Sequence, residues 1–162
     1  MCCGKGALTD LAGVELELVG EEDGQVMRRS DSPRFSDQIL VLRGSAIDAL
    51  ERHLAPDRLV PVCGSPSDAW WYGLEDDHPV ALDWEQSDVE RFPDGRLISV
   101  ERPTFFSDRL RGVPSIFRVW PGESILFRGA FVRDWRISGL VGLDFSLEWS
   151  DEEGGEPDPR AF

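Results

Sequence analysis

No uninterrupted apolar run in this chain is longer than four residues, the length of the run at positions 39–42. Four residues suit a short β-strand, whereas a helix that spans a bilayer needs about 20 apolar residues. Glycine and proline recur between the apolar segments and limit their length. The sequence therefore predicts short strands and helices joined by frequent turns, and it predicts no membrane-spanning helix.

Apolar patterns predict both strands and helices along the chain. Strands are expected at residues 14–19, 39–44, 59–63, 80–84, 97–100, 116–120, 125–128 and 143–147. Helices are expected at residues 46–54, capped by Ser45, and at residues 130–135, with one helical turn at 107–110. Pro61 places its strand at a sheet edge or a bulge. The rest of residues 64–95 is expected to be loop.

The order of these elements indicates the fold class. It is neither a strand–helix alternation nor a pure series of strands, which predicts an α+β fold with a few short helices packed on a mostly antiparallel sheet. Residues 40–44 (LVLRG) resemble residues 125–129 (ILFRG), and each is followed by a helix and a returning strand, which predicts two related strand–helix–strand units. We expect a flexible N-terminus at residues 1–12, a single domain at 13–149 and a disordered acidic tail at 150–162.

Acidic residues dominate the charge, and they are unevenly distributed. The net charge is −14; residues 68–94 hold nine acids and one base, and residues 150–162 hold five acids and one base. Nucleic acids and anionic membranes need cationic protein surfaces, so neither is an expected partner. A basic protein would instead be attracted and its encounter accelerated. The alternative is that the acids only keep the protein soluble.

Residues for catalysis or metal binding are sparse. Of the two histidines, His53 lies in a charged helical segment and is expected at the surface, while His78, beside Asp77, is the stronger functional candidate. No cysteine and histidine spacing suits a metal, and no phosphate-binding loop occurs. We therefore expect no metal, no cofactor and no enzymatic activity.

The cysteines and the N-terminus indicate a compartment. Three cysteines, two of them adjacent near the N-terminus, form no disulfide framework and fit a reducing environment. The N-terminal residues lack the apolar segment of a secretory signal. A cytoplasmic location is expected.

Tryptophan beside acid is the pattern that most favours a binding surface. Interfaces are enriched in tryptophan and tyrosine, and acids around such anchors would suit a cationic partner. The alternative is that the adjacent tryptophans belong to the core. The expected contact residues are Trp70, Trp71, Glu75, Asp76, Asp77, Asp83, Glu85, Asp88 and Glu90.

A series of short phrases between residues 80 and 145 has the order seen in a known family. The phrases are Ala81-Leu82-Asp83, Arg102-Pro103-x-Phe105, Leu110-Arg111-Gly112, Ile116-Phe117-Arg118, Ser124-Ile125-Leu126-Phe127 and the run 138–145 (SGLVGLDF). In these phrases the chain resembles the eleventh catalogued class of immunity proteins from bacterial polymorphic toxin systems, formerly a domain of unknown function. The phrases are structural, and the family carries no catalytic residues to transfer.

The resemblance implies a cytoplasmic immunity protein that binds a cognate toxin domain and blocks its active site. A basic toxin, such as a nuclease or a deaminase, would suit the acidic surface. Two alternatives remain open: an enzyme that acts on a small substrate through carboxylates, and a non-catalytic ligand-binding or structural module.

Overall fold

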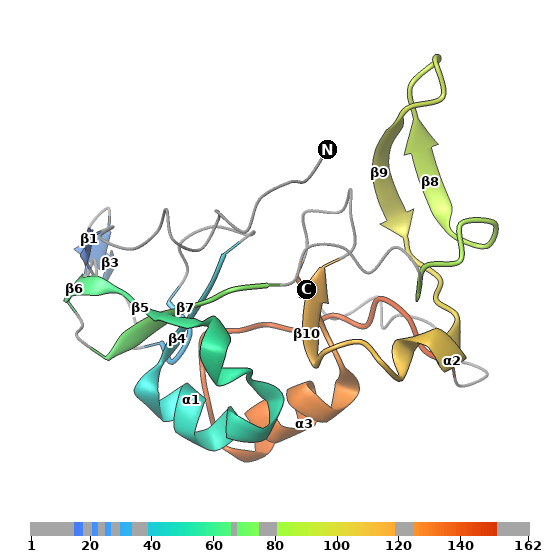
Figure 1. Ribbon diagram of the computed structural model, residues 1–162. Helices are drawn as coiled ribbons and strands as arrows, with labels where there is room; N and C mark the ends of the chain where they lie inside the picture. Colours follow the sequence, from blue (N-terminus) through green and yellow to red (C-terminus); the bar gives the residue numbers. More distant parts are fainter. Residues whose placement is uncertain are drawn as a thin grey trace. The chain divides into compact units, whose positions relative to one another are not determined.

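The computed structural model describes residues 15–17, 21–22, 25–26, 30–33, 39–65, 68–74, 81–118 and 125–151 (Figure 1). These residues form an α+β fold of mostly antiparallel sheets with a few short helices, as the sequence predicts. The expected flexible segment 1–12 and most of the expected tail, from residue 152 on, lie outside the described residues.

The chain divides into two compact units where the sequence predicts a single domain. Unit 1 comprises Met1–Leu74 and Gly129–Leu143, and unit 2 comprises Glu75–Arg128 and Asp144–Phe162. Each unit is described by itself.

Unit 1 holds most of the strands and two of the three α-helices that the described residues form. Its strands are β1 (Glu15–Glu17), β2 (Glu21–Glu22), β3 (Gln25–Val26), β4 (Leu40–Arg43), β5 (Leu59–Pro61), β6 (Cys63–Ser65) and β7 (Ala69–Tyr72). Its helices are α1 (Gly44–Leu50), the 3-10 turns η2 (Glu51–His53) and η3 (Pro56–Arg58), and α3 (Gly129–Ile137).

A three-stranded antiparallel sheet in the order β4-β7-β5 forms the centre of unit 1. The first three residues of β4 are all buried, which explains why this strand is a continuous apolar run rather than an alternation. Pro61 lies in β5 at the edge of the sheet, which confirms its predicted position. Strands β1 and β6 pair in parallel, and β2 pairs with β3 in antiparallel.

Helices α1 and α3 pack together in unit 1 (Figure 1). Helix α1 buries Ala46 and Leu50, and α3 buries Phe131 and Trp135. Each pair is four residues apart and so lies on one face of its helix. The rings of Phe131 and Trp135 stack with their centroids 6.1 Å apart.

The start of α1 differs from the prediction. Ser45 is not the cap, because the N-cap position is Arg43 and no side chain caps the helix. The Ser45 hydroxyl donates instead to the Asp31 carboxylate (2.5 Å). The same carboxylate accepts the Val141 N–H (3.0 Å), and the Asp31 N–H donates to the Val141 carbonyl oxygen (2.8 Å). Asp31 thereby joins the beginning of α1 to the segment that follows α3.

Unit 2 consists of two hairpin-like pairs and a short helix. Its elements are β8 (Asp88–Arg91), β9 (Leu97–Arg102), α2 (Ser107–Leu110), β10 (Ile116–Arg118) and β11 (Ile125–Phe127). Strands β8 and β9 pair in antiparallel, as do β10 and β11. The core consists of Ala81, Leu82, Phe105, Val113 and Phe117.

Several predicted elements have a different form in the structure. The predicted helix 46–54 is α-helical to Leu50 and continues as η2. Residues 80–84 form no strand among those described, since Leu82 makes only an isolated bridge to Phe105 and a turn follows. Two strands, β7 and β8, occur within residues 64–95, where loop was expected.

The described residues do not form the predicted repeat. Its first copy exists as β4, α1 and β5. Its second copy lacks the returning strand, because residues 143–147 pair with no strand. In addition, β11 belongs to unit 2 while α3 belongs to unit 1. The likeness between residues 40–44 and 125–129 therefore does not extend to the structure.

Candidate functional site

The hairpin formed by β8 and β9 extends away from α2 within unit 2 (Figure 1). Its reversal is stiffened by local bonds. The Phe92 N–H donates to the Arg96 carbonyl oxygen (2.7 Å), and the Gly95 N–H donates to the Phe92 carbonyl oxygen (2.9 Å). Gly95 has a φ of 86°, a conformation that favours glycine. The reversal therefore holds the two strands in one register.

The end of the hairpin also carries a packed ion pair. The Arg96 guanidinium donates from Nε to the Asp94 carboxylate (2.7 Å) and lies over the Phe92 ring, 5.1 Å from its centroid. The Arg91 guanidinium donates to the Gly95 carbonyl oxygen (3.2 Å). Two of the three arginines of this hairpin are thus engaged at its end.

One face of the hairpin is acidic. Glu90 lies opposite Ser99 in the register. The Ser99 hydroxyl is 2.5 Å from a carboxylate oxygen of Glu101 and 3.5 Å from one of Glu90, so both acids share its face. Asp88 is two residues from Glu90 on β8 and lies on the same face. All three carboxylates are on exposed residues.

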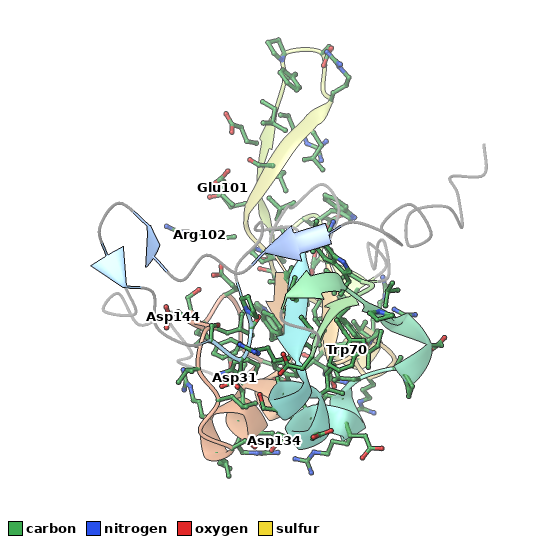
Figure 2. The ribbon with its side chains drawn as sticks, turned by 90° about the vertical axis from the view of Figure 1, so that its left-hand side faces the viewer. Asp31, Trp70, Glu101, Arg102, Asp134 and Asp144 are labelled. Atoms are coloured by element: carbon green, nitrogen blue, oxygen red, sulfur yellow. The ribbon has the colours of Figure 1, made fainter. Side chains whose placement is uncertain are left out.

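Arg102 limits the negative charge of this face. It is paired with Asp88 in the register and is exposed. In Figure 2 the Glu101 and Arg102 side chains project from the base of the hairpin. The acidic face therefore holds three carboxylates and one guanidinium.

The opposite face of the hairpin carries Val89 and Val100 together with Arg91, which lies two residues from Val89. Val89 pairs with Val100, and Val100 packs against the core of unit 2. Two apolar residues near the end of the hairpin are also exposed, Ile98 by 37% and Phe92 by 44%, and Phe92 follows the alternation of Asp88 and Glu90. An acidic face with exposed apolar side chains near it is an arrangement that suits a protein interface.

A turn that leads into β8 contains two more of the predicted contact residues. The Asp83 carboxylate accepts the N–H groups of Glu85 (3.0 Å) and Gln86 (3.2 Å). Asp83 therefore shapes the turn, as aspartate often does. Glu85 is exposed beside Trp84, which is 36% exposed. Glu85 and Trp84 are available to a partner, and Asp83 positions them.

The predicted contact residues do not form one group. Asp83, Glu85, Asp88 and Glu90 lie in unit 2. Trp70 and Trp71 lie on β7 in unit 1, and Trp71 is 1% exposed. We correct the expectation for Trp71, because its side chain is part of the sheet core and presents almost no surface. Glu75, Asp76, Asp77 and the histidine candidate His78 lie outside the described residues.

Sequence reasoning predicted a strand at residues 97–100 but missed its pairing with β8 and its part in the site. Glu101, Ser99, Phe92 and Ile98 were not among the expected contacts. A signal for them was present, since Phe92-Pro93-Asp94-Gly95 is a turn sequence between two short segments that contain apolar and charged residues. Reading that turn as a hairpin would have placed β9 beside β8.

A second group of charged side chains lies between the two helices of unit 1. The Asp134 carboxylate on α3 is 2.6 Å from Nε2 of His53 and accepts Nε of Arg52 (2.8 Å). The His53 side chain is only 7% exposed, so the expectation that it is a surface residue is wrong. Its ring also packs edge-on against Phe131, with centroids 5.6 Å apart. We call Arg52, His53 and Asp134 the helix clasp.

The helix clasp holds an ionised carboxylate. Hydrogen bonds from Arg52 and His53 lower the pKa of Asp134 from its ordinary value of 3.8 to about 2. A general acid needs a raised pKa, so this shift has the opposite direction. At neutral pH the Asp134 carboxylate accepts hydrogen bonds, which fixes α3 against the turn that follows α1.

Within the described part of the chain, no group of three or more histidine, cysteine, aspartate or glutamate side chains is placed to hold a metal ion. None of the helices described here is long and apolar enough to cross a membrane.

No protein-family model matches this chain, and no curated protein matches it.

Proposed function

We propose that this protein is an immunity protein that binds a basic toxin domain and blocks its active site. The observation that carries the proposal is the acidic face of the β8–β9 hairpin, where Asp88, Glu90 and Glu101 are exposed together. The resemblance in residues 80–145 supplies the toxin as the class of partner.

The charge arrangement supports recognition of a cation. None of Asp88, Glu90 and Glu101 forms an ion pair with another residue that the structure describes. A basic surface can therefore approach without first breaking internal pairs, and its attraction raises the association rate by about 10- to 1,000-fold at low salt.

The class of toxin follows from the same charge argument. Nucleases and deaminases that act on nucleic acids bind an anionic substrate through cationic surfaces. An acidic hairpin on such a surface would compete with the substrate for the same arginines and lysines. We propose that this occurs in the cytoplasm, without a cofactor and without catalysis by this chain.

The test of the proposal uses a toxin domain encoded beside the gene, which the resemblance leads us to expect. Co-expression is expected to restore growth, and the purified proteins are expected to form a complex. Failure of both binding and rescue would remove the proposed function.

Charge reversal locates the surface. The triple change Asp88→Lys, Glu90→Lys and Glu101→Lys should lower the association rate at least 10-fold and flatten its dependence on salt. The matched control reverses three exposed acids of unit 1, Asp48→Lys, Glu51→Lys and Asp57→Lys, and so changes the net charge equally. Equal losses in both variants would mean that net charge, and not the hairpin, governs the encounter.

A further inference from the structure

The β8–β9 sheet has two strands, so each strand has an outer edge that pairs with no other strand among the described residues. Free strand edges present unpaired N–H and C=O groups and are templates for another strand. The two edges of this sheet differ in a way that selects one of them.

Both irregularities of the hairpin lie in β9. Asp88 and Val89 pair with Arg102 and Val100, which leaves Glu101 as an extra residue in β9. Further along, Glu90 and Arg91 pair with Ser99 and Leu97, which leaves Ile98 as the second extra residue of β9. Bulges interrupt the row of groups along an edge and hinder pairing with a further strand. Strand β8 contains no extra residue, so its outer edge is regular.

The end of the hairpin shows which backbone groups of β8 face outward. The backbone hydrogen bonds of Phe92, through its N–H and its carbonyl oxygen, run toward the residues that lead into β9. The N–H and C=O of one residue point to the same side of a strand, and this side alternates along the chain. Glu90 and Asp88 therefore point inward like Phe92, and the N–H and C=O groups of Val89 and Arg91 point to the outer edge.

The side chains of β8 specify what could lie beside it. Asp88 and Glu90 occupy one face, and Val89 and Arg91 occupy the other. In neighbouring strands, residues of opposite charge and pairs of apolar residues stabilise each other when they lie side by side. A complementary strand therefore has basic residues beside Asp88 and Glu90, and an apolar residue beside Val89 on its other face.

We propose that the partner of this protein adds a strand to the outer edge of β8, and that this strand alternates basic and apolar residues. This inference rests on the proposed function and specifies how the hairpin recognises its partner. Backbone bonds at Val89 and Arg91 supply affinity, and the carboxylates of Asp88 and Glu90 supply selectivity for a basic sequence.

The first experiment uses a synthetic eight-residue peptide that alternates lysine and valine. The control peptide has the same side chains and charge, but every internal amide is N-methylated, so it cannot pair as a strand. Strand addition predicts that the control binds at least 10-fold more weakly to the full-length protein. It also predicts that the protein variant Asp88→Lys and Glu90→Lys loses binding of the unmodified peptide.

Amide hydrogen exchange supplies a second readout, measured by NMR on the full-length protein with the lysine–valine peptide and then with the toxin domain. The amides of Val89 and Arg91 are expected to exchange at least 10-fold more slowly in the complex, and the Glu90 amide is expected to change little. Strand addition would be overturned if the two peptides bound equally or if neither bound. It would also be overturned if the amides of Val89, Glu90 and Arg91 were all protected to the same extent. If the toxin binds and is neutralised but the alternating protection of the Val89 and Arg91 amides is not seen, the proposed function stands and strand addition is excluded.

Discussion

The helix clasp of unit 1 and the hairpin of unit 2 use the same kinds of charged residue in opposite ways. In the clasp, Asp134 is 12% exposed and accepts hydrogen bonds from two cationic or polar side chains. On the acidic face of the hairpin, Asp88, Glu90 and Glu101 are exposed. The helix clasp pairs its carboxylate with side chains of the protein itself, whereas the hairpin leaves its carboxylates exposed to a partner.

This difference separates stability from recognition. A carboxylate that is held by internal partners contributes to folding and has little remaining capacity to attract another molecule. Exposed carboxylates contribute little to folding, so their positions are free to serve binding. Changes in unit 1 should therefore affect unfolding most, and changes on the acidic face should affect association most.

The largest expected effect is that of Phe131→Ala in unit 1. Phe131 is fully buried between the helices, and its removal leaves a cavity. The free energy of unfolding should therefore fall by about 3–5 kcal/mol. The matched change in the hairpin is Phe92→Ala. Phe92 is 44% exposed, so this change should lower the free energy of unfolding by less than about 1 kcal/mol. Urea titration of both variants measures the difference. Equal losses would contradict the comparison.

Gly142→Ala is expected to have the next largest effect. Gly142 has a φ of 110°, and a Cβ there would overlap Ser30 Oγ and lie 3.0 Å from the Ser32 carbonyl oxygen. Strain and overlap together should destabilise the protein by about 3 kcal/mol. In the hairpin, Gly95→Ala has only the cost of its φ of 86°, about 1 kcal/mol, because no atom lies within 4 Å. Thermal unfolding of both variants tests the order, and a larger loss for Gly95→Ala would reverse it.

Asp134→Asn should change how stability depends on pH. The pKa of Asp134 is lowered by folding to about 2, so its ionised form favours the folded state. This contribution is complete above about pH 4 and is lost as the pH falls through about 2. The asparagine variant should be less stable than the wild type at pH 5, and the difference should shrink between pH 4 and pH 2. Urea midpoints measured across this range check it, and a constant difference would exclude a role for ionised Asp134.

The smallest expected effect on folding is that of Asp88→Lys and Glu90→Lys. Both residues are exposed on β8, and the free energy of unfolding should change by no more than about 0.5 kcal/mol. Arg102, which faces Asp88, could lose a favourable neighbour, but exposed pairs contribute little. Guanidinium denaturation of this variant and the wild type measures the change. A loss comparable to that of Phe131→Ala would mean that the acidic face is part of what stabilises unit 2.

The sequence predicted the fold class and many strands because those features depend on local patterns. The continuous run at 39–42 and the proline at position 61 both gave correct positions in the sheet. Apolar and polar residues alternate at 143–147, as in a strand, yet this segment pairs with none of the strands that the structure describes. Phe145 packs edge-on against Phe127 instead. A strand needs a partner, and the partner is not part of the local pattern.

The candidate site was predicted in part for the same reason. Asp88 and Glu90 were identified from the density of acid, but Glu101 belongs to a segment of lower charge and joins them only through the pairing of β8 with β9. The helix clasp was not predicted, because His53 and Asp134 are 81 residues apart in the sequence. Trp71 was assigned to a surface because an aromatic cluster beside acids resembles an interface until its burial is known.

The division of the chain has a consequence for its synthesis. Unit 1 is completed by α3, which follows the first and longer segment of unit 2, Glu75–Arg128, in the sequence. While a ribosome is making residues 75–128, the face of α1 that contains Ala46 and Leu50 has no second helix to cover it. A nascent chain is therefore exposed to aggregation until Phe131 and Trp135 have emerged, and a fragment that stops before Gly129 should be insoluble or depend on chaperones.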